Sequence, residues 1–525
     1  MPERDKPEGK LRMFSPGKFN ELKIGSLLAY GQTFAGAVIA LVYTPLVLTY
    51  LGTDGYGIYS AATAVVSYVA LLNFGFSSSY VRFYYRCKVD CNEQELAKTN
   101  GFFLLLFLSI ATLALLAGMF LSANARLIFA DGMTAEELLT TRKTMAILTV
   151  GMAVDLGSSL FGAMLTAHEK FIFFKSINIL KTIMCPMVIY VFLLLGYRII
   201  TMAVISVAFS LLVDLCFILY CLCKLKVKFD IRHPRKEQLI EITAFSSFIA
   251  ISSIVDQINW SLDKVILGRY KGAGSIAVYS VASQINVIFM QASTAVSTIY
   301  IPRINRMVAE RQAATVLTDL FIRIGRFQLL VLLPIFIGFI FLGKSFISIW
   351  LPTGYMDSYA IALLLIGPTI IPYIQNAGIT IQTAQAKHRF RAILYTGMAL
   401  FNLALSIILC PRYGGMGCAF ATAISILIAN GVIMNIYYRR VIKLDIARFW
   451  TSMSAFLFPA TCMGVSGYLI SQIIAISDYL TLVCCAMLMT IIFFSTAWLT
   501  ALTPEEKKFV FNFLKKDKSN ENNSA

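Results

Sequence analysis

The stretch Tyr50-Leu-Gly52-Thr-Asp-Gly-Tyr-Gly-Ile-Tyr59-Ser60-Ala-Ala62 recurs 220 residues later as Tyr270-Lys-Gly272-Ala-Gly-Ser-Ile-Ala-Val-Tyr279-Ser280-Val-Ala282. Each copy lies between two long apolar runs, at the turn from an odd-numbered span to the next even-numbered one. Each following run ends at an arginine, Arg82 in the first copy and Arg303 in the second. Because an even number of spans separates the copies, they share one orientation. The repeat therefore predicts two parallel-related halves.

Composition places these halves in a membrane. Hydrophobic residues make up 58% of the 525 residues and charged residues only 14%, and the mean hydropathy is +0.74. A soluble domain is about a quarter charged, so this chain cannot cover a large water-facing surface. The net charge of +17 comes from basic residues in short segments between apolar runs. That pattern is typical of the positive-inside rule and argues against a nucleic-acid partner.

A helix crosses the bilayer with about 20 apolar residues, and the apolar runs predict an all-α polytopic protein with about fourteen such helices. When the N-terminus is placed in the cytoplasm, most of the 45 Lys and Arg residues fall on the inner side. Both termini are therefore expected in the cytoplasm, and the first run is expected to be a retained helix. The predicted spans are 24–50, 56–78, 99–121, 145–166, 173–195, 200–223, 243–268, 274–301, 320–343, 358–384, 391–410, 415–437, 450–472 and 477–501.

These spans give an expected domain organisation of two six-helix lobes and an added pair of helices. The successive parts are a cytoplasmic tail at 1–22, an N-lobe at 23–223, a basic cytoplasmic linker at 224–242, a C-lobe at 243–437, helices 13 and 14 at 449–501, and a cytoplasmic tail at 502–525. The loops between the spans are short. Any functional site is therefore expected inside the membrane or close to it.

The predicted seventh span carries the densest set of polar residues. Asp256, Asn259 and Asp263 are three, four and seven residues apart, so they share one helical face, and Lys264 lies on the adjoining face. Charges inside a span are costly and usually face a cavity or a partner. We expect this helix to line a cavity, with Lys264 as a candidate for an anionic head group and the two aspartates as its counter-charges or as proton carriers. Structural pairing with neighbouring helices, or snorkelling of Lys264, is the alternative.

Other polar residues within the spans form a second set of candidates. Asp155, Asp214, Gln32 and Gln284 are candidates for ion coupling or for a polar core. Lys181 is a candidate cavity residue whose side chain could instead snorkel to the inner interface. Single Asn and Gln residues in such helices more often form interhelical hydrogen bonds than ligand contacts. The last two helices carry almost no polar residues, so the cavity is expected among the first twelve.

Signatures of catalysis and of metal binding are missing from the sequence. The three histidines, His168, His233 and His388, fall in predicted cytoplasmic loops without metal-ligand spacing. The sequence holds no phosphate-binding glycine loop and no hydrolase or metalloprotease motif. We therefore expect no catalytic residue, no metal and no cofactor, and a transporter rather than an enzyme. An ion gradient, or the gradient of the transported molecule itself, is the expected energy source.

An ordered set of short motifs along nearly the whole chain resembles a known family. The set consists of Pro45–Tyr59, Leu72-Asn73-Phe-Gly75-Phe76 leading to Val81-Arg82-Phe83-Tyr84, Leu262–Gly268, Ala277–Ala282, Ile349-Trp350-Leu351-Pro352 and Tyr413–Ala419. Together these motifs resemble the Wzx-like flippases for O-antigen and capsule repeat units. Those flippases belong to the multidrug/oligosaccharidyl-lipid/polysaccharide (MOP) exporter superfamily.

The resemblance implies a MATE/MurJ-like fold, in which two lobes surround a central cavity with alternating access in the bacterial cytoplasmic (inner) membrane. It implies an undecaprenyl-diphosphate-linked oligosaccharide as cargo, with membrane lipids, a polysaccharide polymerase and the chain-length machinery as partners. Arg82 and Lys264 are then expected to pair with the diphosphate. A drug/cation antiporter and a flippase of lipid-linked peptidoglycan precursors are the nearest alternatives. A polysaccharide polymerase or ligase is less favoured, because no large outer loop is predicted.

Overall fold

The computed structural model describes residues 16–89, 93–129, 132–231, 254, 257, 261–385, 387 and 389–508. These residues are almost entirely helical, and no strand occurs among them. The helices are α1 (Pro16–Val69), α2 (Phe76–Val89), α3 (Glu93–Ala123), α4 (Ala125–Phe129), α5 (Ala135–Ala167), α6 (Phe171–Leu194), α7 (Ile199–Leu219), α9 (Gly272–Ser297), α10 (Ile301–Ala309), α11 (Ala314–Trp350), α12 (Asp357–Ile374), α13 (Asn376–Ala384), α14 (Arg389–Ile426), α15 (Met434–Tyr437), α16 (Ile446–Ser454), α17 (Leu457–Ile473) and α18 (Tyr479–Thr496). A further helical stretch covers 261–270.

Eleven helical stretches in the described part of the chain are long and apolar enough to cross a membrane. The two longest, Leu27–Lys88 and Arg389–Ile442, each contain a kink, at Gly52 and Gly414 respectively. Most of the predicted seventh span lies outside the described residues. The prediction of an all-α polytopic membrane protein is confirmed. The count of fourteen helices and the cytoplasmic position of both termini stay predictions.

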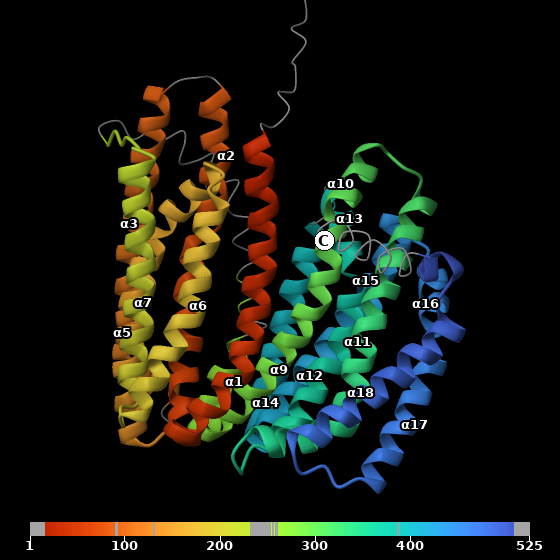
Figure 1. The fold of residues 1–525 in the computed structure, drawn as a ribbon. Helices are drawn as coiled ribbons and strands as arrows, with labels where there is room; N and C mark the ends of the chain where they lie inside the picture. Colours follow the sequence, from red (N-terminus) through yellow and green to blue (C-terminus); the bar gives the residue numbers. More distant parts are fainter. Residues whose placement is uncertain are drawn as a thin grey trace, which may run out of the picture. The chain divides into compact units, whose positions relative to one another are not determined.

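The chain forms two compact units. The first unit contains Met1–Tyr43, Tyr68–Ser122 and Lys143–Ser253, and the second contains Thr44–Ser67, Ala123–Arg142 and Ile254–Ala525. The boundaries between the units fall inside α1 and α5, so neither helix belongs to one unit alone. Figure 1 shows α3, α5, α6 and α7 of the first unit as a bundle of long helices.

Aromatic side chains fill the core of the first unit. The Tyr80 and Phe103 rings meet edge to face at 5.3 Å, and the Phe174 and Phe217 rings stack at 5.2 Å. Tyr80 Oη also donates to Asn100 Oδ1 at 2.9 Å, so its one polar atom is satisfied inside the core. These contacts join helices α2, α3, α6 and α7. Large aromatic residues bury much apolar area at a small cost in side-chain entropy.

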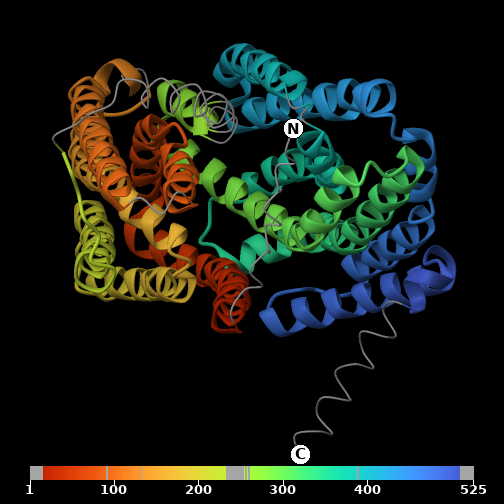
Figure 2. The same ribbon diagram turned by 90° about the horizontal axis from the view of Figure 1, so that it is seen from above.

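In the second unit, α12 packs against α9, α11 and α14, and α17 and α18 pack against each other and against α11. Figure 1 shows α11, α17 and α18 running side by side, and Figure 2 shows the last helices, in blue, along the outside of this unit. Hydroxyl groups of α17 and α18, such as those of Ser466 and Thr490, donate to backbone carbonyl groups of their own helix.

The two glycines that align in the repeated motif, Gly52 and Gly272, both have a positive φ. Gly52 has a φ of 73° and Gly272 a φ of 80°. A side chain would be strained in that left-handed region, and each glycine reverses the chain between two helices. The copies also approach closely within the second unit, because a Cβ at Gly57 would overlap the carbonyl oxygen of Ala273. The glycine shared by the two copies is therefore required by the backbone.

Candidate functional site

Asp263 lies at the centre of a polar cluster inside the second unit. The residue is 4% exposed. Its carboxylate accepts hydrogen bonds from Tyr279 Oη on α9, from Ser406 Oγ at 3.1 Å and from Thr422 Oγ1 at 3.0 Å, the last two on α14. A buried carboxylate is costly unless hydrogen-bond donors surround it. Within the described residues, the three hydroxyl groups meet that requirement, and no hydrogen bond or ion pair joins the carboxylate to a basic residue.

Asn402 extends the Asp263 cluster by one residue. Its Nδ2 donates to Thr422 Oγ1 at 3.2 Å, and its Oδ1 lies 3.1 Å from Ser406 Oγ. Carboxylate, amide and hydroxyl oxygens thus gather at one point. Hard cations such as Na⁺ and Ca²⁺ prefer oxygen ligands of this kind, and a proton would bind to the carboxylate alone. The cluster can therefore hold a small cation or a proton.

A cavity of about 260 Å³ adjoins this cluster. Tyr279, Asn402 and Thr422 contact Asp263 or one another and also line the cavity. Farther along, the Arg391 guanidinium lies 4.8 Å from the centre of the Tyr395 ring, and Tyr395 Oη donates to Asn430 Oδ1 at 2.8 Å. The cavity therefore connects the buried carboxylate with a basic residue inside the same unit.

Lys264 follows Asp263 directly on the 261–270 helix and is half-buried. Within the described part of the chain, no residue forms a hydrogen bond or an ion pair with its ammonium group. Asp256 and Asn259, which were predicted to share a face with Asp263, lie outside the described residues. Gln257 Nε2 donates to Ser261 Oγ at 2.7 Å and also to Ser67 Oγ. Gln257 thereby links the 261–270 helix to the part of α1 that follows Gly52.

Gln284, another candidate from the sequence, forms an interhelical hydrogen bond. Its Nε2 donates to Thr44 Oγ1 at 2.8 Å, joining α9 to α1 within the second unit. This is the interhelical role that single amide side chains in membrane helices usually have. The structure does not bring Gln284 into the Asp263 cluster.

The remaining candidates lie in the first unit. The Asp214 carboxyl group on α7 lies near the Asp155 carboxyl group on α5 and near Ser158. Lys181 Nζ on α6 donates to Ser210 Oγ at 2.6 Å. Asp214 also lines a cavity of about 360 Å³ whose other walls include Ser77, Ser78, Ser158 and Ser159. Two neighbouring carboxyl groups repel each other when both are ionised, so Asp155 and Asp214 form a second polar centre that can hold a proton or a cation.

Arg82 and Gln32 are not part of that centre. The Arg82 side chain is exposed. Gln32 Oε1 accepts a long hydrogen bond of 3.5 Å from Lys175 Nζ. Of the sequence candidates in the described part of the first unit, the structure therefore brings Asp155 and Asp214 together, and Lys181 lies close enough to interact with the Asp214 carboxyl group.

Ser406 and Thr422 were not singled out from the sequence, and Tyr279 entered only as part of the repeat and of the family motif Ala277–Ala282. Asn402 and Ser406 are four residues apart, which places them on one helical face. That spacing was the one signal available. Hydroxyl residues are common in apolar helices, where many bond their own backbone, as Thr396 Oγ1 does to Ala392 O at 2.8 Å. Only the tertiary contacts distinguish a hydroxyl group that bonds to Asp263 from one that bonds to its own helix backbone.

Comparison with known proteins finds a matching family and a matching transporter. Residues 25–308 match the family described as polysaccharide biosynthesis protein. A Shigella flexneri protein named "Putative O-antigen transporter" is 21% identical over 403 residues, which cover 74% of this chain and 91% of that protein.

Solved structures of low sequence identity share the fold. The lipid II flippase MurJ in an inward closed conformation matches with a TM-score of 0.70 at 19% identity, over 90% of this chain and 98% of MurJ. The MATE multidrug transporter DinF-BH matches with a TM-score of 0.59 at 14% identity, over 80% and 95% of the two chains. The predicted MATE/MurJ-like fold is confirmed.

Proposed function

The chain belongs to the polysaccharide biosynthesis protein family, and on that premise we propose that it flips an undecaprenyl-diphosphate-linked oligosaccharide across the bacterial cytoplasmic membrane. It is a multi-pass transporter of the MOP type and not an enzyme. The proposed cargo is the repeat unit of an O-antigen or of a capsular or exopolysaccharide. The alignment with the O-antigen transporter, which covers nearly all of that relative, carries this proposal.

The proposal keeps the two-lobe plan with alternating access. A repeat with the same orientation in both copies suits two lobes that move as rigid bodies about a shared path. The matching positive φ of Gly52 and Gly272 supports the equivalence of the two copies. In this plan, residues 23–223 and 243–437 form the lobes and 449–501 forms the added pair of helices.

Lys264 and Arg82 are the proposed contacts of the cargo diphosphate. An ammonium or a guanidinium forms short, charge-assisted hydrogen bonds with phosphate oxygens. Lys264 fits this role because it is half-buried and, within the described residues, its charge is not neutralised by an ion pair. Arg82 fits because its charge is exposed and ends the second span of the first repeat copy. Their role is charge pairing, without bond making.

Asp263 is the proposed site of the coupling ion. Its carboxylate is buried, its hydrogen-bond donors in the described part of the chain are hydroxyl groups, and it lies beside a cavity through which an ion and water could reach it. Binding of a proton or a Na⁺ ion would displace hydroxyl donors from the carboxylate and so alter the contacts among the 261–270 helix, α9 and α14. Such a change shifts the equilibrium between two conformations of one lobe.

Two variants test the cargo contact in cells. Lys264→Ala is expected to abolish most surface polysaccharide, measured by gel electrophoresis, while immunoblotting shows a normal amount of protein in the membrane. Lys264→Arg keeps the charge and should retain partial function. Arg412→Ala, which removes an exposed cation outside the candidate sites, is the matched control. Normal polysaccharide in the Lys264→Ala cells would exclude this residue.

A liposome assay separates the proposed cargo from the alternatives. The purified chain should translocate an undecaprenyl-diphosphate oligosaccharide, measured by the accessibility of the sugar to an added glycosidase. A preference for lipid II would instead favour a peptidoglycan-precursor flippase, whose fold this chain shares. Export of a cationic dye without any lipid-linked sugar activity would favour a drug antiporter.

The coupling ion is tested in the same liposomes. An imposed proton or sodium gradient should accelerate wild-type translocation, and Asp263→Asn should remove the acceleration while slow translocation without a gradient persists. Asp263→Glu should restore part of the response. An unchanged response in Asp263→Asn would refute the proposed coupling site and leave the cargo assignment standing.

A further inference from the structure

An arginine-lined cavity lies in the second unit, away from the Asp263 cluster. Its volume is about 420 Å³. Arg303 on α10, Arg323 and Arg326 on α11, and Arg448 on α16 contribute to its walls, together with the chain that follows α18. None of the candidate residues for cargo or ion binding that the structure describes lines this cavity.

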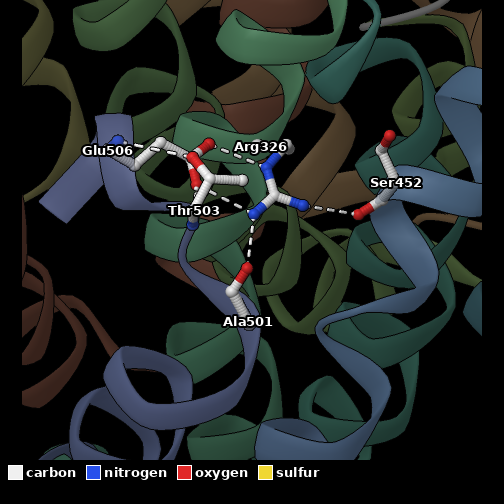
Figure 3. A network of polar contacts seen from close by, with 5 residues as sticks. All are labelled: Arg326, Ser452, Ala501, Thr503 and Glu506. Carbon is white, nitrogen blue, oxygen red and sulfur yellow. Dashed lines mark hydrogen bonds and ion pairs between the residues drawn. The ribbon is translucent and has the colours of Figure 1, made fainter.

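One wall of the cavity is held rigidly by the buried pair Arg326 and Glu506, shown in Figure 3. Arg326 Nε and Nη2 donate to the two carboxylate oxygens of Glu506 at 2.7 and 2.9 Å. Both side chains are 6% exposed. The bidentate geometry fixes both groups, so this pair builds the wall and is not available to a ligand.

Backbone contacts complete the same wall. Arg326 Nη1 donates to Ser452 O at 2.7 Å, and Nη2 donates to Ala501 O at 2.6 Å, as Figure 3 shows. The guanidinium also lies 5.0 Å from the centre of the Phe456 ring. Arg326 thereby fastens α16 and the chain after α18 onto α11. The cavity is therefore preformed.

The charges around the cavity favour an anion. Arg448 pairs with Asp319 at 2.6 Å, and Arg326 pairs with Glu506. Arg303, which is exposed, Arg323, which is half-buried, and the acidic Glu505 complete the charged residues of the described lining. The basic groups outnumber the acidic ones, and their guanidinium groups match the geometry of phosphate oxygens.

The helices beside the cavity have the character of a membrane surface. Helix α10 buries Ile304 and exposes Arg303 and Arg306, and α16 buries Phe449 and exposes Arg448 and Trp450. Tryptophan and arginine on amphipathic helices are typical of the membrane–water interface. The charge pattern of the sequence predicts that this end faces the cytoplasm, where the leaflet carries anionic lipids.

We propose that this cavity binds the phosphate of an anionic phospholipid in the cytoplasmic leaflet through Arg303 and Arg323. The bound head group bridges α10 and α11 next to the fixed wall formed by Arg326 and Glu506. The lipid is a ligand of the transporter and not its cargo. The inference therefore stands independently of the proposed function.

Native mass spectrometry of the purified full chain in detergent tests the proposal. Phosphatidylglycerol is the anionic probe, phosphatidylcholine the zwitterionic control lipid, and inorganic phosphate the soluble anion. Wild type should bind phosphatidylglycerol in clear preference to phosphatidylcholine. Arg303→Gln and Arg323→Gln should each weaken binding about tenfold, since each removes one charge-assisted contact.

Two further variants keep the test independent of folding defects. Arg306→Gln removes a neighbouring α10 arginine that pairs with Glu310 at 2.9 Å and does not line the cavity, so binding should stay unchanged. Asp319→Asn removes the partner of Arg448 and should tighten binding. Size-exclusion chromatography verifies that each variant is monodisperse.

Three results would overturn the proposal. The first is equal binding of both lipids by wild type. The second is weakening by Arg306→Gln that matches the weakening by Arg303→Gln and Arg323→Gln. The third is inorganic phosphate that competes with the lipid at equal concentration, which would identify the site as one for a soluble anion.

Discussion

The substitution Arg326→Gln tests whether the buried ion pair holds the last helices on the second unit. Glutamine is too short and lacks the charge to reproduce the two contacts with Glu506. The change leaves a carboxylate that is 6% exposed without its cation. It also leaves the carbonyl groups of Ser452 and Ala501 without their donor.

Breaking one partner of a buried ion pair costs about 3–5 kcal/mol, because the remaining charge is stranded. The contacts of Arg326 meet the conditions for that range: both partners are buried, the geometry is bidentate, and two backbone carbonyls share the donor. Arg448→Gln is the matched control. Its pair with Asp319 is more than half exposed on both sides, so its loss should cost about 0–1 kcal/mol.

The assay is unfolding of the purified chain in mixed detergent micelles with increasing denaturing detergent, followed by tryptophan fluorescence. Arg326→Gln and Glu506→Gln should both lower the midpoint strongly, and Arg448→Gln should barely change it. The double variant Arg326→Met/Glu506→Leu should recover part of the loss, because no charge is then buried. Equal midpoints for Arg326→Gln and Arg448→Gln would refute the reasoning.

Three further predictions concern packing, pH and the first unit. Gly57→Ala should destabilise the second unit by about 1–3 kcal/mol, because the added Cβ would overlap the Ala273 carbonyl group. Gly31→Ala is the control: its Cβ would meet no atom within 4 Å, so this variant should be neutral or slightly stabilising in the same unfolding assay. Burial by itself raises the pKa of Glu506, but hydrogen bonds from Arg326 and from the Thr503 amide outweigh burial, so the pKa lies below the ordinary 4.5. The pair therefore stabilises the fold fully above pH 4.5 and loses this contribution as the pH falls through the lowered pKa of Glu506 in the folded state. The unfolding midpoint of wild type should fall in that pH range, and Glu506→Gln should not show this fall. Tyr80→Phe should lower the free energy of unfolding by about 1–3 kcal/mol, since it leaves the buried Asn100 Oδ1 without its donor. Slow amide hydrogen exchange in α2 and α3 should then become faster, and unchanged exchange would contradict this role of Tyr80.

Most of the architecture could be predicted from the sequence because the bilayer imposes it. The runs expected at 99–121, 173–195 and 274–301 coincide with helices α3, α6 and α9 to within six residues at their ends. A backbone in hydrocarbon must bond within its own segment, so a long apolar run can only be a helix. The resemblance to the flippase family was likewise carried by ordered motifs, and the family match confirms it.

Candidate sites were harder to predict because hydrogen bonds join residues that are far apart in the chain. Asp263 was singled out as a costly buried charge, but its partners Ser406 and Thr422 lie 143 and 159 residues away. Arg326 was not singled out from the sequence, yet it lies buried in α11 and pairs with Glu506, 180 residues away. Apart from the four-residue spacing of Asn402 and Ser406, neither set of partners carries a local signal.

The sequence by itself determined that the chain is an all-helical membrane protein built on a repeat. Apolar runs, glycine turns and the placement of basic residues depend only on residues that are close together in the chain. Only the tertiary structure decided which polar residues meet. Helix packing brings the hydroxyl groups of α9 and α14 to Asp263 and folds the chain after α18 back onto Arg326. The physical reason is that a buried charge requires partners, while any nearby helix can supply them.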